Sequence, residues 1–272
     1  MSIKQTVWVR RTFALTTFAA FGTWVEQAPH GQDMDLRLAG PPGAQVMADA
    51  MTDGAFLPLS MGTGNSSHGS AMVAWGGYTS DRDRAILDAR AEVALLPWLV
   101  LQARTATDPE STGVRPSVGL RLRLIGESGA RPGIALGAFY KTEGFTEPEG
   151  EMEGLLAFSA HLGRLGLLAN LVYGQDADGR ERDGEVGAAV TIGLGQRWLL
   201  GLDSRARLNL APNAAAQPGK QPLPHFDLVA GPLAMCRLGP AFLAAQAGIA
   251  MIELAGLRSG VFVMVGFGAA FR

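Results

Sequence analysis

Residues 118–126, VGLRLRLIG, alternate apolar and charged side chains with a period of two. Successive side chains of a β-strand point to opposite faces of the sheet, so this pattern predicts a strand with one apolar and one charged face. The pattern recurs from about residue 70 to the end of the chain. It predicts an all-β protein with twelve strands, at 71–79, 84–95, 99–106, 117–126, 133–141, 154–162, 165–174, 185–194, 199–209, 225–235, 241–253 and 260–271.

Short and long connections alternate between these segments. The short ones lie at 96–98, 127–132, 163–164, 195–197 and 237–239. Longer polar connections lie at 107–113, 142–152, 175–184 and 210–224, whereas the outer connections near 80–83 and 254–259 are short as well. An even number of antiparallel strands, with tight turns at one end and longer loops at the other, is typical of a transmembrane up-and-down β-barrel.

Two places fix details of the predicted ladder. A hairpin with the two-residue turn Gly163-Arg164 pairs Leu162 with Leu165, and it carries the apolar face of one strand onto that of the next. Pro232 lies inside the segment 225–235 and has no N–H to donate, so a closed ladder needs a bulge or an open rung at this residue.

The aromatic residues distinguish a membrane barrel from a soluble one. Tyr78, Tyr140 and Tyr173 all fall next to predicted long loops, and Trp98 and Trp198 fall at predicted short turns. Membrane barrels carry aromatic girdles at both interfaces, where a ring is partly in water and partly in lipid. The pattern therefore favours leucines facing lipid, while a soluble β-barrel binding protein with its apolar face inward stays an alternative.

The polar side chains of the strands are then predicted to line the lumen. A charge on the lipid face of a barrel costs roughly 2–4 kcal/mol at the bilayer midplane, so the charged face must point inward. Two interpretations stay open: a passive small-solute channel with a mild preference for anions, or an interior filled by salt bridges that conducts little. The predicted lumen-lining residues are Asp88, Arg90, Glu92, Gln102, Arg104, Arg121, Arg123, Asn170, Asp203, Arg205, Arg207, Asp227 and Gln246.

Composition excludes several other classes of protein. The mean hydropathy is +0.15, yet no run approaches the roughly 18 apolar residues of a membrane-spanning helix. The formal net charge of −2 gives no basic field for nucleic acid. The single cysteine, Cys236, cannot form an internal disulfide, and no cofactor is expected.

The first part of the chain differs from the alternating part. Lys4, Arg10 and Arg11 precede a short apolar stretch that ends in small residues, so residues 1–28 are predicted to be a signal peptide. Residues 29–69 show no sustained period and are interpreted as an irregular periplasmic lead-in or plug segment. Residues 70–272 are predicted to form the barrel.

The alternating part, from about residue 70 to 272, resembles Gram-negative outer-membrane β-barrel proteins. Its last segment, SGVFVMVGFGAAFR, is an amphipathic strand with the terminal aromatic Phe271, followed here by one further residue, Arg272. The resemblance implies an outer-membrane location, contact with outer-membrane lipid and lipopolysaccharide, and recognition of the final strand by the outer-membrane assembly machinery. It extends to an architecture and not to a particular activity.

One group of residues suggests an enzyme. Ser159 and His161 share a strand face, and Asn170 lies beside them in the predicted hairpin, a set of residue types that suits acyl hydrolysis. Outer-membrane lipid hydrolases are similar barrels, but in them the His precedes the Ser and the pair faces lipid. The protein is accordingly expected not to be an enzyme, with a lipid acyl hydrolase as the alternative.

No metal site is expected. Asp176, Asp178 and Asp183 lie in a segment that resembles the start of a calcium loop, but Arg180 and Arg182 interrupt the spacing. The acid-rich connection at 142–153 is interpreted as a solvated surface loop that contributes solubility. The four histidines, His30, His68, His161 and His225, lie far apart in the sequence.

Overall fold

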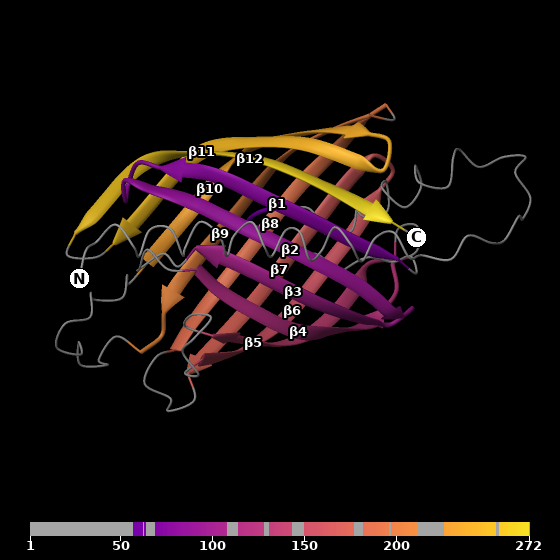
Figure 1. Cartoon of the computed structure of the whole chain (residues 1–272), viewed down its shortest axis with the longest axis horizontal. Helices are drawn as coiled ribbons and strands as arrows, with labels where there is room; N and C mark the ends of the chain where they lie inside the picture. Colours follow the sequence, from indigo (N-terminus) through magenta and orange to yellow (C-terminus); the bar gives the residue numbers. More distant parts are fainter. Residues whose placement is uncertain are drawn as a thin grey trace, which may run out of the picture. The chain divides into compact units, whose positions relative to one another are not determined.

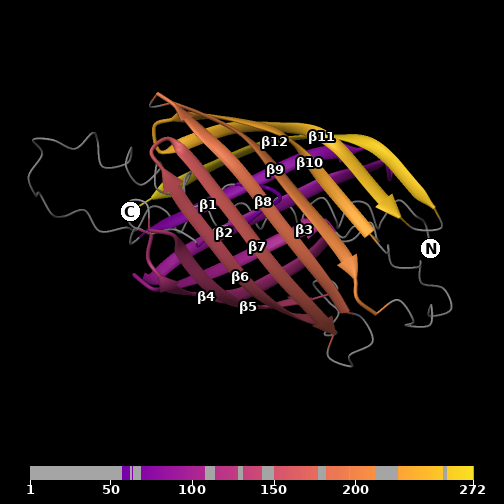
Figure 2. The same ribbon diagram turned by 180° about the vertical axis from the view of Figure 1, so that it is seen from behind.

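The structure, a computed structural model, describes residues 57–61, 63, 69–107, 114–127, 131–142, 150–176, 182–195, 197–211, 226–253 and 256–271. Within these ranges, antiparallel strands form a closed barrel in which each strand pairs with its neighbours in the chain and β12 pairs with β1 (Figures 1 and 2). The predicted up-and-down barrel is therefore confirmed. Its strands are β1 (Ser70–Thr79), β2 (Arg84–Leu96), β3 (Leu99–Thr107), β4 (Val114–Ile125), β5 (Gly133–Thr142), β6 (Gly150–Leu162), β7 (Leu165–Asp176), β8 (Arg182–Leu194), β9 (Trp198–Asn209), β10 (Phe226–Leu238), β11 (Ala241–Glu253) and β12 (Leu257–Phe271).

The observed strands match the predicted ones and extend beyond several of them. The hairpin of β6 and β7 has the predicted register, with Leu162 opposite Leu165 and Phe158 opposite Ala169. Four strands begin three or four residues earlier than predicted: β4 at Val114, β6 at Gly150, β8 at Arg182 and β12 at Leu257. Alternation is weak there because Pro116, Gly154 and Gly184 interrupt the apolar face, although the ladder of hydrogen bonds continues.

The tight turns lie at one end of the barrel, where both chain ends of the barrel also lie, because Ser70 of β1 pairs with Phe271 of β12. Three of these turns contain a glycine with positive φ: Gly163 (+64°), Gly195 (+64°) and Gly239 (+70°). Such angles match the twist of two-residue hairpin turns, and a Cβ would strain them. The last of these turns lies at residues 239–240 and not at 237–239, because β10 continues to Leu238.

The ladder accommodates Pro232 by an open rung. Ala230 pairs with Ile249 and Leu233 with Gln246 in one unbroken register, so no residue is inserted and there is no bulge at this point. Pro232 still lies opposite Leu202 of β9. At the open rung β10 and β11 approach so closely that a Cβ on Gly231 would overlap the carbonyl group of Ala247.

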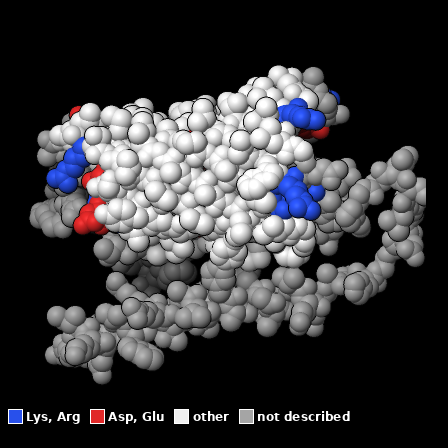
Figure 3. Space-filling model, turned by 90° about the horizontal axis from the view of Figure 1, so that it is seen from above, with Lys and Arg blue, Asp and Glu red and all other residues white. Residues whose placement is uncertain are grey.

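The exterior of the barrel is apolar. Leu120, Leu122 and Leu124 of the stretch VGLRLRLIG are 46%, 38% and 53% exposed, and the outward residues of the other strands follow the same pattern. In the view of Figure 3, charged side chains gather near the two ends of the barrel and the band between them carries none. A soluble barrel would bury these leucines, whereas lipid covers them in a membrane. Among the described residues, no helix has the length and hydropathy to cross a membrane.

A charge in the middle of this band is expected to destabilise the barrel. Leu202 is 62% exposed on β9, between the two ends of the strand. We expect Leu202→Arg to lower the free energy of unfolding by about 2–4 kcal/mol, because the guanidinium must leave water for hydrocarbon. Denaturant titration of the protein in lipid vesicles measures this loss.

Leu210→Arg is the matched control, since Leu210 is 50% exposed just beyond the loop end of β9. A charge close to the interface costs only about 0–1 kcal/mol. Equal losses for the two variants would contradict the assignment of this band to lipid.

Candidate functional site: the barrel interior

The residues predicted to line the lumen differ in how far they are buried. Nine of them are buried: Asp88, Arg90, Glu92, Gln102, Arg121, Asn170, Asp203, Asp227 and Gln246. Arg104, Arg205 and Arg207 are partly exposed toward the loop end of their strands. Arg123 lies at the turn end, where its Nη1 donates a hydrogen bond of 2.8 Å to the carbonyl oxygen of Pro97.

A ladder of charges crosses β2, β3 and β4. Arg121 Nη2 lies 2.5 Å from Glu92 Oε1, and both side chains are about 1% exposed. The same nitrogen donates a hydrogen bond of 2.9 Å to Gln102 Oε1. Two residues after Gln102 on β3, toward the loops, Arg104 Nε donates a hydrogen bond of 3.0 Å to Asp88 Oδ2. Opposite charges brought together in this way compensate part of the cost of removing each from water.

A second set of ion pairs lies toward the loop end of the interior. Lys141 Nζ is 2.5 Å from Glu151 and 2.6 Å from Glu153, and Arg207 pairs with Asp183. The interpretation of 142–153 as a solvated loop is wrong for Glu151 and Glu153, and Asp183 lies on β8 and not in the predicted connection at 175–184. Because β6 and β8 extend into the predicted loops, their inward positions carry these carboxylates into the barrel.

The short connection between β1 and β2 contributes to this set as well. Arg82 Nη2 lies 2.8 Å from Asp227 Oδ2, which also lies 3.4 Å from Arg205 Nη2. Sequence reasoning missed Arg82, because a charged residue in a tight loop is ordinarily solvated. The positive φ of Asp83, 53°, marks the local turn beside it.

Part of the chain before the barrel lies inside it. Hydrogen bonds to the barrel wall hold this segment, defined here as the inner segment, residues 57–61 and 63. Leu59 N donates to Asp203 Oδ2 at 3.0 Å, and Met61 N donates to Asn170 Oδ1 at 2.9 Å. Thr63 Oγ1 and Ser159 Oγ are 2.9 Å apart. These partners come from β9, β7 and β6, so the three bonds fix the inner segment along the wall formed by β6 to β9.

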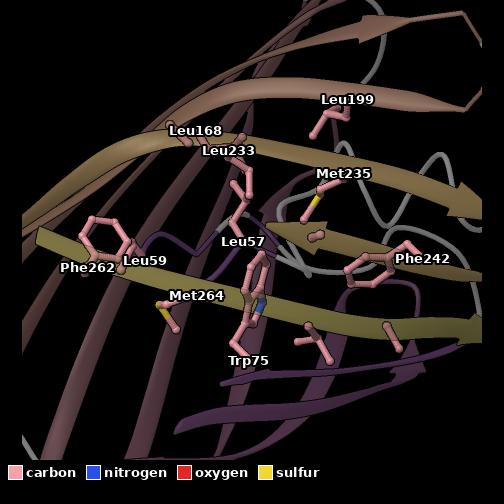
Figure 4. Close-up of a cluster of buried hydrophobic side chains, with 14 of the residues drawn as sticks. Leu57, Leu59, Trp75, Leu168, Leu199, Leu233, Met235, Phe242, Phe262 and Met264 are labelled. Atoms are coloured by element: carbon pink, nitrogen blue, oxygen red, sulfur yellow. The ribbon is translucent and has the colours of Figure 1, made fainter. Parts of the chain in front are cut away.

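Apolar side chains fill much of the remaining interior. Figure 4 shows Leu57 and Leu59 of the inner segment among Trp75, Phe242, Phe262 and neighbouring aliphatic residues. A second cluster joins Met61 to Phe139, Leu155 and Val172. The sequence pattern did not reveal this apolar interior, because an apolar residue on the inner face interrupts a strict alternation. Gly266 leaves room for Trp75, since a Cβ there would lie 2.5 Å from the indole ring.

The residues proposed for hydrolysis have other partners. Glu127 lies between Ser159 and His161: Ser159 Oγ donates to Glu127 Oε2 at 2.9 Å, and His161 Nδ1 bonds the other carboxylate oxygen. Asn170 accepts the Met61 N–H instead of orienting the imidazole. A general base must bond the nucleophilic hydroxyl, and no Ser159–His161 hydrogen bond occurs in the described part of the chain. Ser159 and Asn170 therefore form hydrogen bonds with the inner segment, and Ser159 and His161 form hydrogen bonds with Glu127.

The aromatic residues predicted to form girdles are all exposed on the exterior. Tyr78, Tyr140 and Tyr173 are 48%, 37% and 46% exposed, and Trp98 and Trp198 are 50% and 51% exposed. The Tyr173 hydroxyl donates to Gln175 Oε1 at 2.9 Å, and that of Tyr78 donates to Asp83. Tyr78 and Tyr173 thus combine an exposed ring with a hydrogen-bonded hydroxyl, an arrangement that suits an interfacial position.

Other predicted features fall outside the described residues or lack a site. The predicted signal peptide, most of the predicted lead-in, and His30, His68, His225 and Asp178 lie outside them. No group of three or more potential metal-ligating side chains occurs within the ranges that the structure describes. Cys236 is a free, partly buried thiol.

Comparisons with known proteins agree with this architecture. No protein-family model matches the sequence, and no curated protein matches it significantly. Among solved structures, the chain is similar to the NanC porin (TM-score 0.54, 10% identity) and the KdgM porin (TM-score 0.52, 7% identity), each over 74% of this chain and 99% of the other. It is also similar to the COG4313 outer membrane channel from Pseudomonas putida F1 (TM-score 0.50, 11% identity), over 79% of this chain and 97% of the other. Together with its apolar exterior, the fold is that of an integral outer-membrane β-barrel.

Proposed function

We propose that this protein is a passive outer-membrane channel for small solutes, in which the inner segment restricts the passage. The observation that carries the proposal is the combination of a lipid-compatible exterior with charged side chains enclosed in a closed barrel. A barrel that served only as a membrane scaffold would have no need of so many ionised groups inside, since each must be desolvated and paired.

The inner segment makes the channel narrow. A twelve-stranded barrel lies between eight-stranded barrels, whose side chains fill the interior, and sixteen-stranded porins with open water-filled channels. Here Leu57, Leu59 and Met61 pack in the apolar clusters and occupy part of the cross-section. On the loop side of this segment the interior is lined by the ion pairs of Arg104, Lys141 and Arg207, which are groups that favour hydrated solutes.

The solved relatives support a channel rather than an enzyme. All three structures compared above are porins or channels by their descriptions, and one structure of the KdgM porin is a complex with disordered oligogalacturonate (TM-score 0.51). For this chain we propose the general class of passive transport, with lipid and lipopolysaccharide around the barrel. We also propose that the final strand, which ends at Phe271 and pairs with β1, is the part that the outer-membrane assembly machinery recognises.

Conductance of the full chain in planar lipid bilayers tests the channel. We expect small current steps that scale with salt concentration, because ions must pass a partly filled interior. Heat-modifiable gel mobility serves as the control for correct folding. Folded protein that gives no current, both in its natural form and after release of the inner segment, would contradict the proposal.

A further inference from the structure

Among the described residues, Arg90 is a buried cation without a paired carboxylate. It lies on β2 between Asp88 and Glu92, opposite Val73 of β1 and Arg104 of β3. Its exposed fraction is 4%. Two of its three guanidinium nitrogens, Nε and Nη1, are buried and have no hydrogen-bond partner among the described residues.

The neighbouring acids are bonded to other arginines. Asp88 accepts from Arg104, and Glu92 accepts from Arg121. The group formed by Asp88, Arg90, Glu92, Arg104 and Arg121 therefore holds three cations and two anions. Its excess positive charge has no partner within the group, and Arg90 is the member without a bonded carboxylate.

An enclosed guanidinium in this situation favours an added anion. Buried charges in proteins are almost always paired, because an unpaired one loses its hydration without compensation. The unmet N–H groups are buried donors, and an anion that accepts them forms charge-assisted hydrogen bonds. The limited space around a side chain that is 4% exposed restricts the ligand to a small anion.

We propose that Arg90 is the anion-binding residue of the interior, with a small oxyanion, a carboxylate or inorganic phosphate, as its ligand. This inference deepens the proposed channel and rests on it for the route by which the anion arrives. Arg104 and Arg121 raise the local positive charge while they keep their own carboxylates. The anion is bound on the wall formed by β2 and its neighbours β1 and β3.

Chloride NMR on the folded full chain in detergent tests this site without requiring a current. Chloride-35 is the probe, and sodium acetate and sodium phosphate are the competitors at constant ionic strength. We expect the protein to broaden the chloride signal and the preferred oxyanion to reverse the broadening. Arg90→Gln should weaken chloride binding at least about tenfold, since it removes charge-assisted hydrogen bonds.

Arg205→Gln is the matched control, because it removes an inward arginine that already has Asp227 as a partner. Arg205→Gln should keep the broadening of the chloride signal. If Arg90→Gln fails to fold, Arg90→Lys replaces it in the test; this variant retains the charge and should keep part of the broadening. Broadening that is absent, unchanged by both Arg90 substitutions, or lost equally in Arg205→Gln would overturn the site. If Arg90-dependent binding is found in a protein that passes no current, the site stands and the channel function fails.

Discussion

Loss of the bonds that hold the inner segment is expected to open the channel. In the double variant Asn170→Ala/Asp203→Ala, the backbone N–H groups of Leu59 and Met61 lose their acceptors. Each unsatisfied buried donor costs about 1–3 kcal/mol, so the held state loses at least about 2 kcal/mol in total. An equilibrium changes about tenfold for each 1.4 kcal/mol, and we expect the mean current through reconstituted protein to rise by about tenfold or more.

The measurement is the mean current per folded barrel in planar bilayers, compared with the natural sequence at the same salt concentration. Thr191→Ala is the control, because Thr191 is a buried polar residue on β8 without a hydrogen bond to the inner segment among those described. It should leave the current unchanged. A current that stays at the natural level in the folded double variant would show that the inner segment does not restrict the passage.

Removal of one partner from the most deeply buried ion pair is expected to destabilise the barrel strongly. Glu92→Ala leaves the guanidinium of Arg121, which is about 1% exposed, without its carboxylate. Breaking a buried pair in this way costs about 3–5 kcal/mol, because the remaining charge is neither hydrated nor compensated. Denaturant titration in lipid vesicles, followed by gel mobility or tryptophan fluorescence, measures the loss.

Two further variants test the cause of this loss. Glu92→Met/Arg121→Met removes both charges, and we expect it to recover most of the stability, since apolar residues of similar size replace buried pairs at little cost. Glu253→Gln changes an exposed acid at the loop end of β11 and should alter the free energy of unfolding by no more than about 0.5 kcal/mol. A double variant as unstable as Glu92→Ala would show that shape and not charge accounts for the effect.

The sequence predicted the architecture well, because a strand repeats every two residues and local alternation records it. The twelve strands, the register of the β6–β7 hairpin and the outward leucines of VGLRLRLIG follow from this period. These properties depend on neighbours along the chain or across one pair of strands.

The alternating pattern did not locate the strand ends near the loops. Glu151, Glu153 and Asp183 lie where glycines interrupt the apolar face, so alternation ends before the hydrogen bonds do. Pro232 was a similar case: its lack of an N–H required a local irregularity, and only the closed ladder decided on an open rung without a bulge.

What the tertiary structure alone decided is the content of the interior. Alternation indicates that Arg90, Arg104 and Arg121 point to the same side of the sheet. Within the part of the chain that the structure describes, residues from other strands pair with Arg104 and Arg121 but not with Arg90. Likewise, no local pattern in residues 57–63 indicates that their backbone meets Asn170 and Asp203, more than a hundred residues away. The sequence by itself determined which side of each strand meets lipid, because that depends on a period of two. The occupancy of the space between the strands depends on closure of the barrel, which brings distant residues together.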